Sequence, residues 1–292
     1  MANTQDIRRR IKSIRNTSQI TKALQMVAAS KMRKAQMSAL AGRSYASLMN
    51  RVLVSLQQRT DPKLHPLLQV REVKKELVVV LSTDKGLAGP LNTNLFREAI
   101  KFEADKALYV TSGAKARQFI VRTRRELLAD FPLKDAPAFT ETKQISKFCV
   151  EKFLGGEVDK VSVLFTHFIN TINQKPTVRT LLPISAFDLP QNSVAAESAE
   201  GNGDPMIGYT FEPAPEAVLD IMLPYYLHYQ VYQMVLDARA SEHSSRMVAM
   251  KNATDNAKQF IKDLTLEYNK MRQASITTEL LEIATAQMAV GG

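Results

Sequence analysis

The sequence has 292 residues, of which 45% are hydrophobic and 23% charged, a composition that favours a folded protein over a disordered one. It contains no run of the roughly 20 apolar residues that a membrane span needs, and its start, MANTQDIRRR, lacks the apolar stretch of a secretion signal. The one cysteine, Cys149, excludes an intramolecular disulfide and a cysteine-based zinc cage, so a reducing cytoplasm is expected.

The net charge of +10 is concentrated near the start of the chain. Residues 1–59 hold twelve Lys and Arg residues and one acid, whereas residues 60–209 hold twenty bases and eighteen acids, and residues 210–292 hold seven bases and ten acids. A basic segment of this kind favours an acidic partner, such as nucleic acid, anionic lipid or acidic protein loops.

Both ends of the chain are predicted to form long helices. Segment 4–57 contains no Pro and a single Gly, and segment 225–290 contains neither, so as unbroken helices they would be about 80 and 100 Å long. Pro213 and Pro215 suit the first turn of the C-terminal helix, whereas Pro224 is expected to kink it. Helices of this length usually need a partner.

Residues in both helices recur in steps of three and four, the spacing of a coiled coil. The N-terminal set is Ile7, Ile11, Ile14, Thr21, Leu24, Ala28, Met32, Ala35 and Ala39. The C-terminal set is Val231, Val235, Ala238, Ala253, Ala257, Phe260, Leu264, Tyr268, Met271 and Ser275. Because many of these residues are small and bury little apolar area, we expect a thin, antiparallel coiled coil of modest stability. Homodimerisation through either helix is the alternative.

Between the helices the pattern changes to that of an α/β domain. Apolar runs at 76–86, 107–113, 160–168 and 176–184 predict buried strands, and amphipathic stretches at 91–104, 114–129 and 141–154 predict helices between them. This order indicates a Rossmann-like domain with a mostly parallel sheet. The predicted domains are therefore the N-terminal coiled-coil helix 1–59, the α/β domain 60–210 and the C-terminal coiled-coil helix 211–292. Residues 185–210, rich in Asn, Ser, Gly and Glu, are expected to form a mobile loop.

An α/β domain raises the possibility of nucleotide binding. The turn STDKGLAGPLN at 82–92 places Gly86 and Gly89 before a helix, but it lacks the G-x-G-x-x-G spacing, and the chain has no P-loop. We therefore interpret this turn as structural, with a nucleotide-dependent enzyme as a second function class. No cofactor or metal is expected.

Other reactive residues are given structural interpretations. In ASEHSSR, residues 240–246, neighbouring side chains point in different directions, so Ser241, Glu242 and His243 cannot form a catalytic triad, while Glu242 and Arg246 can pair. Cys149 is expected to be a small core residue. The basic N-terminal helix could follow phosphates, which gives a third class, a nucleic-acid binder, although no aromatic residue for base stacking precedes Tyr45.

Four long strings resemble the gamma subunits of F-type ATP synthases. They are ITKALQMVAASKMRKAQ (20–36), FINTINQKPTVRTLLPI (168–184), QVYQMVLDARASEHSSRMVAMKNATDNA (230–257) and YNKMRQASITTELLEI (268–283). The resemblance covers nearly the whole chain in order and includes the turn at 82–92.

The resemblance implies a central rotor shaft without a catalytic site of its own. Its coiled coil would enter the ring of catalytic and non-catalytic (beta and alpha) subunits, and its α/β domain would stand on the membrane rotor ring of c subunits, beside the epsilon subunit. One copy would serve each complex, and no nucleic acid would bind. With no transit peptide in view, the expected location is the cytoplasmic face of a bacterial inner membrane, as a peripheral protein.

Particular residues are carried over from the family pattern. Those implied to contact catalytic subunits are Arg272, Gln273, Thr277, Arg246, Lys22, Leu24 and Lys31. An apolar bearing tip is implied at Ile283, Ala284, Met288, Ala289 and Val290. The sequence departs from the family pattern at Ala286 and Gln287, where Gly-Ala is usual, and at Ala88 and Pro90, where Cys and Gly are common. It also lacks the paired cysteines of chloroplast relatives, so thiol regulation is not expected.

Overall fold

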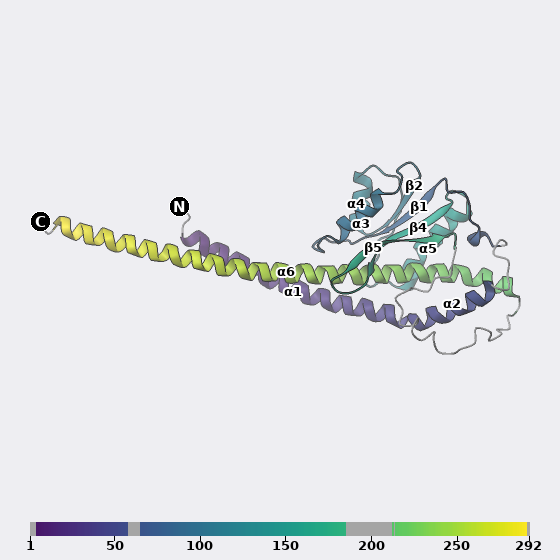
Figure 1. Cartoon of the computed structure of the whole chain (residues 1–292), viewed down its shortest axis with the longest axis horizontal. Helices are drawn as coiled ribbons and strands as arrows, with labels where there is room; N and C mark the ends of the chain where they lie inside the picture. The colour runs from purple at the N-terminus through teal and green to yellow at the C-terminus, as the bar shows by residue number, and fades with distance from the viewer. Residues whose placement is uncertain (1–3, 58–64, 185–211, 213, 291–292) are drawn as a thin grey trace. The chain divides into compact units, whose positions relative to one another are not determined.

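The computed structural model describes residues 4–57, 65–184, 212 and 214–290 (Figure 1). The helices are α1 (Thr4–Ala41), α2 (Arg43–Gln57), the short 3-10 helix η2 (Pro66–Leu68), α3 (Leu91–Ile100), α4 (Ala114–Arg122), α5 (Phe139–Leu154) and α6 (Pro215–Val290). The strands are β1 (Glu76–Leu81), β2 (Ala107–Ser112), β3 (Leu127–Asp130), β4 (Lys160–Phe168) and β5 (Gln174–Leu182). The predicted loop 185–210 lies outside the described residues.

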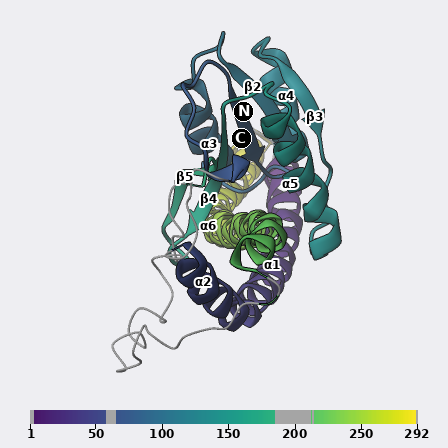
Figure 2. The ribbon, with the colours of Figure 1, turned by 90° about the vertical axis from the view of Figure 1, so that its right-hand side faces the viewer.

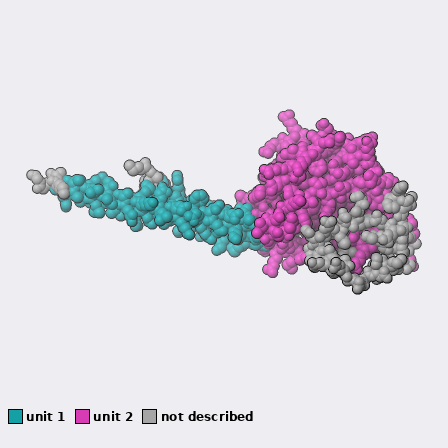
Figure 3. All heavy atoms as spheres, viewed as in Figure 1, with its two compact units in different colours: residues 1–29, 246–292 teal, residues 30–245 magenta. Residues whose placement is uncertain are grey.

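The chain divides into two compact units (Figure 3). Unit 1 combines the first part of α1 with the second part of α6, since it comprises Met1–Ala29 and Arg246–Gly292. Unit 2 is Ser30–Ser245 and contains the sheet. Across the described residues, no helix has the length and apolarity that crossing a bilayer requires.

The five strands of unit 2 form one sheet in the order β3-β2-β1-β4-β5. Glu76 of β1 lies opposite Ala107 of β2 and Lys160 of β4, and both pairings are parallel. β5 pairs antiparallel with β4. The mostly parallel sheet is thus confirmed, with two corrections: β3 was not predicted, and the helix predicted over 114–129 ends at Arg122. Gly113 and the left-handed Arg124 bound this short helix, and the segment after it joins the sheet edge.

Successive side chains of β1 point to opposite faces of the sheet and belong to a hydrophobic core on each face. Leu77, Val79 and Leu81 belong to a cluster completed by α2, α5 and α6, whereas Val78 and Val80 pack with α3 and α4 on the other face. Every one of these strand side chains is buried, as expected for parallel strands covered on both faces. The arrangement of helices around the sheet is seen in Figure 2.

The predicted single helix 4–57 is two helices that meet at Gly42. A Cβ atom at this position would lie 2.6 Å from the hydroxyl oxygen of Tyr229 and 2.8 Å from Nε2 of Gln233. The Tyr229 hydroxyl also donates a hydrogen bond to the Gly42 carbonyl. Glycine therefore accommodates the close approach of α6, since a larger residue would displace the ends of these two side chains, and α2 starts one residue later.

Helix α6 has 76 residues and begins at Pro215, as predicted, whereas Pro213 lies outside the described residues. It continues through Pro224. His65, at the start of η2, places Nε2 3.2 Å from Oδ1 of Asp220, four residues before this proline.

In unit 1 the two helices are antiparallel. The hydroxyl groups of Thr21 and Thr254 are 2.7 Å apart, and Arg8 donates to the hydroxyl of Tyr268, so advancing along α6 corresponds to going back along α1. The least exposed positions follow the same register in steps of three and four. They are Thr4, Ile7, Ile11, Ile14, Ser18, Thr21, Gln25 and Ala28 on α1, and Met250, Thr254, Ala257, Ile261, Leu264, Tyr268 and Met271 on α6. The predicted antiparallel coiled coil is confirmed.

Three residues of the predicted seam were wrong. Phe260 is 59% exposed and its neighbour Ile261 takes the seam position, while Leu24 is 37% exposed and Gln25 replaces it. Ser275 is exposed as well, because α1 has no residue at its level in this register. At the first two positions the prediction favoured the larger apolar side chains, Phe260 and Leu24. Counting from seam residue to seam residue in alternating steps of four and three gives Ile261 and Gln25 instead.

Candidate functional site

The end of α6 has no partner among the described residues. Every residue from 272 to 287 is exposed, including Arg272, Gln273 and Thr277. The Thr277 hydroxyl donates only along its own helix, to the Gln273 carbonyl at 2.9 Å. These three predicted contact residues therefore lie close together and face solvent.

An apolar stripe runs along this same segment in a new direction. Ile276, Leu280 and Ile283 are 48, 61 and 58% exposed, and their spacing of four and three puts them on one face of the helix. The seam of unit 1 would instead continue through Ser275, Thr278 and Glu282, which are polar. The apolar positions are thus shifted by one or two residues from the continued seam, so the apolar face is turned by more than 100° at the level where α1 no longer accompanies α6.

The predicted bearing tip is described in part. Ile283 and Ala284 are exposed. Met288, Ala289 and Val290 belong to α6, but their side chains lie outside the described residues. Exposed apolar residues on a helix without a partner indicate a surface that another protein covers.

The predicted contact residues of α1 have different environments. Lys22 is exposed, and Leu24 is 37% exposed. Lys31 instead forms an ion pair with Asp135, which lies in the loop between β3 and α5. Arg246, on α6, is half-buried.

The partner of Lys31 is held in its charged form. Asp135 also lies 3.2 Å from Nε2 of His243, and Arg239 contributes a further positive charge. Burial of Asp135 favours its protonated form, but the hydrogen bond from Lys31 and the charges of His243, Lys31 and Arg239 outweigh it and lower the pKa of Asp135. The basic character of Lys31 is therefore partly neutralised within this chain.

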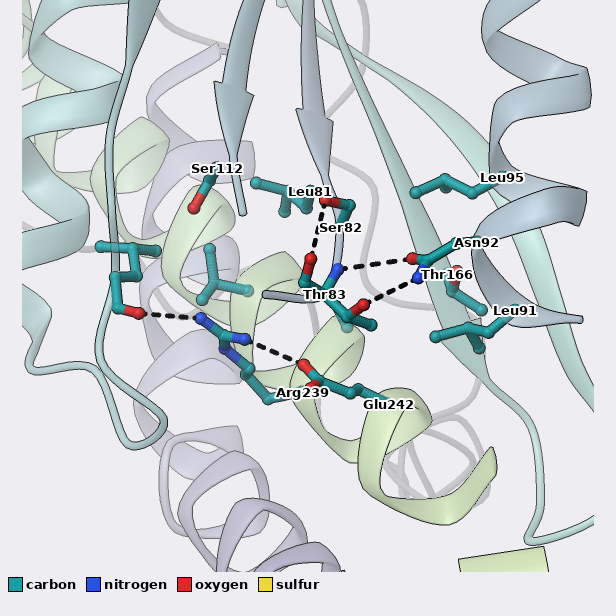
Figure 4. A pocket seen from close by; sticks show the side chains of 13 residues that line it. Leu81, Ser82, Thr83, Leu91, Asn92, Leu95, Ser112, Thr166, Arg239 and Glu242 are labelled. Atoms are coloured by element: carbon teal, nitrogen blue, oxygen red, sulfur yellow. Dashed lines mark hydrogen bonds and ion pairs between the residues drawn. The ribbon is translucent and has the colours of Figure 1, made fainter. Parts of the chain in front are cut away.

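The crevice at the carboxyl ends of β1 and β4, where open α/β sheets usually bind ligands, is filled by α6. Arg239 and Glu242 point into it from the helix and are joined at 2.9 Å (Figure 4). Asn92, in the first turn of α3, donates a hydrogen bond to the hydroxyl of Thr83, in the turn after β1, at 2.8 Å. The remaining cavity has about 10 Å³ of space, room for one water molecule. This cavity is too small for a nucleotide.

Residues 239–245 of α6, which we call the collar segment, are all buried although six of the seven are polar or charged. Ser241 donates to the Thr166 carbonyl at 2.9 Å, Ser244 to the Thr171 carbonyl at 2.9 Å, and Ser245 to the Ala88 carbonyl at 2.7 Å. These three hydrogen bonds were not predicted from the sequence, where only the pairing of Glu242 with Arg246 was expected. The three closely spaced serines in a region of Ala and Met were the available signal.

Cys149 has the predicted core position. It is fully buried, and burial raises the pKa of its thiol to about 12. Among the described residues no group of three His, Cys, Asp or Glu side chains is placed to hold a metal ion.

Comparisons with known proteins decide the family. The family profile described as ATP synthase matches residues 3–290. The ATP synthase gamma chain of Methylacidiphilum infernorum is 51% identical over 297 residues, covering 100% of both chains. The chain belongs to the ATP synthase gamma chain family. The gamma chains of Opitutus terrae, 51% identical over 99% of both chains, and Akkermansia muciniphila, 46% identical over 99% of this chain and 100% of its relative, agree.

Membership of the gamma chain family confirms the predicted identity, a central-stalk rotor subunit of the proton-transporting ATP synthase that is itself non-catalytic. Solved structures share the fold at low sequence identity. A chain of the Euglena gracilis mitochondrial ATP synthase has a TM-score of 0.68 at 20% identity, over 98% of this chain and 94% of its own length. A chain of the Tetrahymena thermophila central stalk and c-ring has a TM-score of 0.60 at 24% identity, over 80% and 99%.

Proposed function

We propose that this chain is the rotating shaft of a bacterial F-type ATP synthase, present in one copy per complex. The observation that carries the proposal is the exposed end of α6, residues 272–287, with its apolar stripe turned away from the seam. A long helical surface of this kind needs a partner outside the chain. The matched structures of Euglena and Tetrahymena include F1 and the c-ring, or the central stalk and c-ring, which gives the class of partner.

The contacts near the C-terminal end of α6, which we call the upper contacts, are proposed for the ring of beta and alpha subunits. Arg272, Gln273 and Thr277 would meet a loop of one catalytic subunit, and Ile283 and Ala284 would begin an apolar bearing that Met288, Ala289 and Val290 complete. Polar and apolar side chains on a helix surface, without a deep pocket, favour contact that changes smoothly as the shaft turns.

Lower on the shaft, Lys22, Leu24, Lys31 and Arg246 would face acidic loops of the catalytic subunits. Lys22 is exposed and free to follow such loops as they pass. The charge of Lys31 would be partly neutralised by Asp135, which weakens the attraction between Lys31 and an acidic loop at any one angle of the shaft. Attraction that is similar at every angle avoids a rotational position in which the shaft would stop.

The α/β part would stand on the c-ring beside the epsilon subunit, at the cytoplasmic face of the bacterial inner membrane, as a peripheral protein. The work would be divided among a coiled-coil helix 1–59, a foot 60–210 and a second coiled-coil helix 211–292. Proton flow would turn the c-ring and the foot, and the asymmetric helices would move each catalytic site through states of different affinity for nucleotide.

The test is ATP hydrolysis by matched alpha and beta subunits with and without this chain, followed by sizing of the complex. One copy per ring and strongly raised turnover are expected. A variant with Arg272→Ala, Gln273→Ala and Thr277→Ala should lose much of this stimulation. The matched control changes Lys258, Gln259 and Thr265 to Ala, because these residues lie on the same helix and are also exposed.

Absence of both complex and stimulation would refute the shaft function. Salt-sensitive binding of the free chain to nucleic acid would then favour the third function class. Equal loss of stimulation in the variant and its control would refute the roles proposed for the three upper contact residues.

A further inference from the structure

We propose that the collar segment of α6 fixes the rotational position of this helix in the sheet unit and so carries torque between them. The inference rests on the proposed shaft function and assigns the transfer of torque to residues that are buried within this chain. Ser241, Ser244 and Ser245 are the positioning residues.

The acceptors of the collar segment are backbone carbonyls from separate parts of the fold. The carbonyl of Thr166 belongs to β4, that of Thr171 to the turn between β4 and β5, and that of Ala88 to the turn after β1. Arg239 adds a fourth, since it donates to the carbonyl of Leu133 at 3.0 Å in the loop after β3. Backbone acceptors cannot follow a turning helix by changing a rotamer, so each bond defines one angle of α6.

The contacts also lie on opposite sides of the helix. Successive residues of an α-helix differ by about 100°, so Arg239 and His243 point to one side of the helix, and Ser241 and Ser245 point to roughly the opposite side. His243 faces Asp135, and Asp237 accepts from the backbone N–H of Phe168 at 2.9 Å. Figure 2, which looks nearly along α6, shows strands and helices on several sides of it.

Stability alone does not explain a polar collar segment. Buried polar groups cost free energy unless they are hydrogen-bonded, and apolar side chains of similar shape would be about as stable. An apolar helix surface, however, offers ridges and grooves that repeat along and around the helix, so a turned position is only slightly worse than the original one. Directional hydrogen bonds to fixed carbonyls remove that choice.

The expected effect follows from the number of bonds. Each serine–carbonyl hydrogen bond, with its usual net contribution to stability, lowers about fivefold the fraction of molecules in which α6 has turned. Loss of all three would raise that fraction about 100-fold if the bonds act independently. Torque favours the turned position of the helix further. The loss of proton pumping per ATP should therefore be largest when the rotor works against a steep proton gradient.

The experiment uses the complete ATP synthase in membrane vesicles and measures protons pumped per ATP hydrolysed at increasing opposing gradients. The variant carries Ser241→Ala, Ser244→Ala and Ser245→Ala. The control, Thr265→Ala, removes a hydroxyl of α6 that donates to its own helix at the Ile261 carbonyl. We expect normal pumping per ATP without a gradient, and a loss of about twofold or more relative to the control at the steepest gradient.

A ratio equal to the control at every gradient, in assembled complexes, would overturn the proposal. A fall of the same size at zero gradient would also overturn it, because a merely distorted fold does not depend on load. If the triple variant fails to assemble, Ser245→Ala alone decides the question by the same criterion. Failure of the wild-type chain to stimulate ATP hydrolysis would instead refute the shaft function itself.

Discussion

The hydroxyl pair of Thr21 and Thr254 provides a direct test of the seam in unit 1. The two oxygens are 2.7 Å apart, and each hydroxyl also lies near a carbonyl of its own helix, that of Ser18 at 3.1 Å and that of Met250 at 2.8 Å. Replacing one threonine by valine keeps the shape and removes the bond between helices. Each single variant should therefore lower the free energy of unfolding by about 1 kcal/mol.

The double valine variant should recover part of this loss. Both hydroxyls are then gone together, and two methyl groups meet at a position where Thr254 is 3% exposed. A double-mutant cycle should give a coupling free energy of about 1 kcal/mol between the two sites. The assay is urea unfolding of the full chain followed by helical circular dichroism.

A matched control pairs Thr254→Val with Thr17→Val. Thr17 is exposed and its hydroxyl donates to the Ser13 carbonyl of its own helix at 3.1 Å. The control cycle should be additive. A coupling near zero for Thr21 and Thr254, or an equal coupling in the control, would refute the antiparallel register derived from this pair.

Three further outcomes are expected. Gly42→Ala should destabilise the chain by about 1–2 kcal/mol in thermal unfolding, because its Cβ displaces the Tyr229 hydroxyl, 2.6 Å away; an unchanged midpoint would contradict the close approach. Cys149, whose pKa burial raises to about 12, should react with a thiol reagent at pH 8 only on unfolding, and rapid reaction of the native chain would contradict its burial. Burial, with the charge of Lys143, lowers the pKa of His228 below 6.5, so stability should fall as pH drops below 6.5 and the unfolded state takes up the proton; an equal fall in His228→Asn would refute this cause.

The architecture followed from the sequence where periodicity was unambiguous. The continuous apolar runs of β1, β2 and β4 and the stretch after Pro224 without Pro or Gly each allow one interpretation. The short strand β3, LLAD, did not, because it directly follows α4 and has only four residues. Its place in the sheet is set by pairing with β2, a tertiary contact that the local pattern does not contain.

The candidate site was predictable to different degrees. Arg272, Gln273 and Thr277 could be named from the resemblance; they are exposed, and their contact role stays a prediction. The ion pair of Lys31 with Asp135 joins residues 104 positions apart, a separation that no local motif bridges. The collar segment was hidden for another reason: serine is compatible with exposure and with burial, and only the surrounding carbonyls show which applies.

The seam of unit 1 has one more consequence, because both of its halves belong to the same chain. Their association is intramolecular, with an effective concentration that covalent connection typically raises to the millimolar range. Dilution should therefore leave the paired helices intact, unlike a dimeric coiled coil, which dissociates. A second copy could use this seam only by displacing α6 from α1. The paired helices are thus complete in one molecule before any partner subunit arrives.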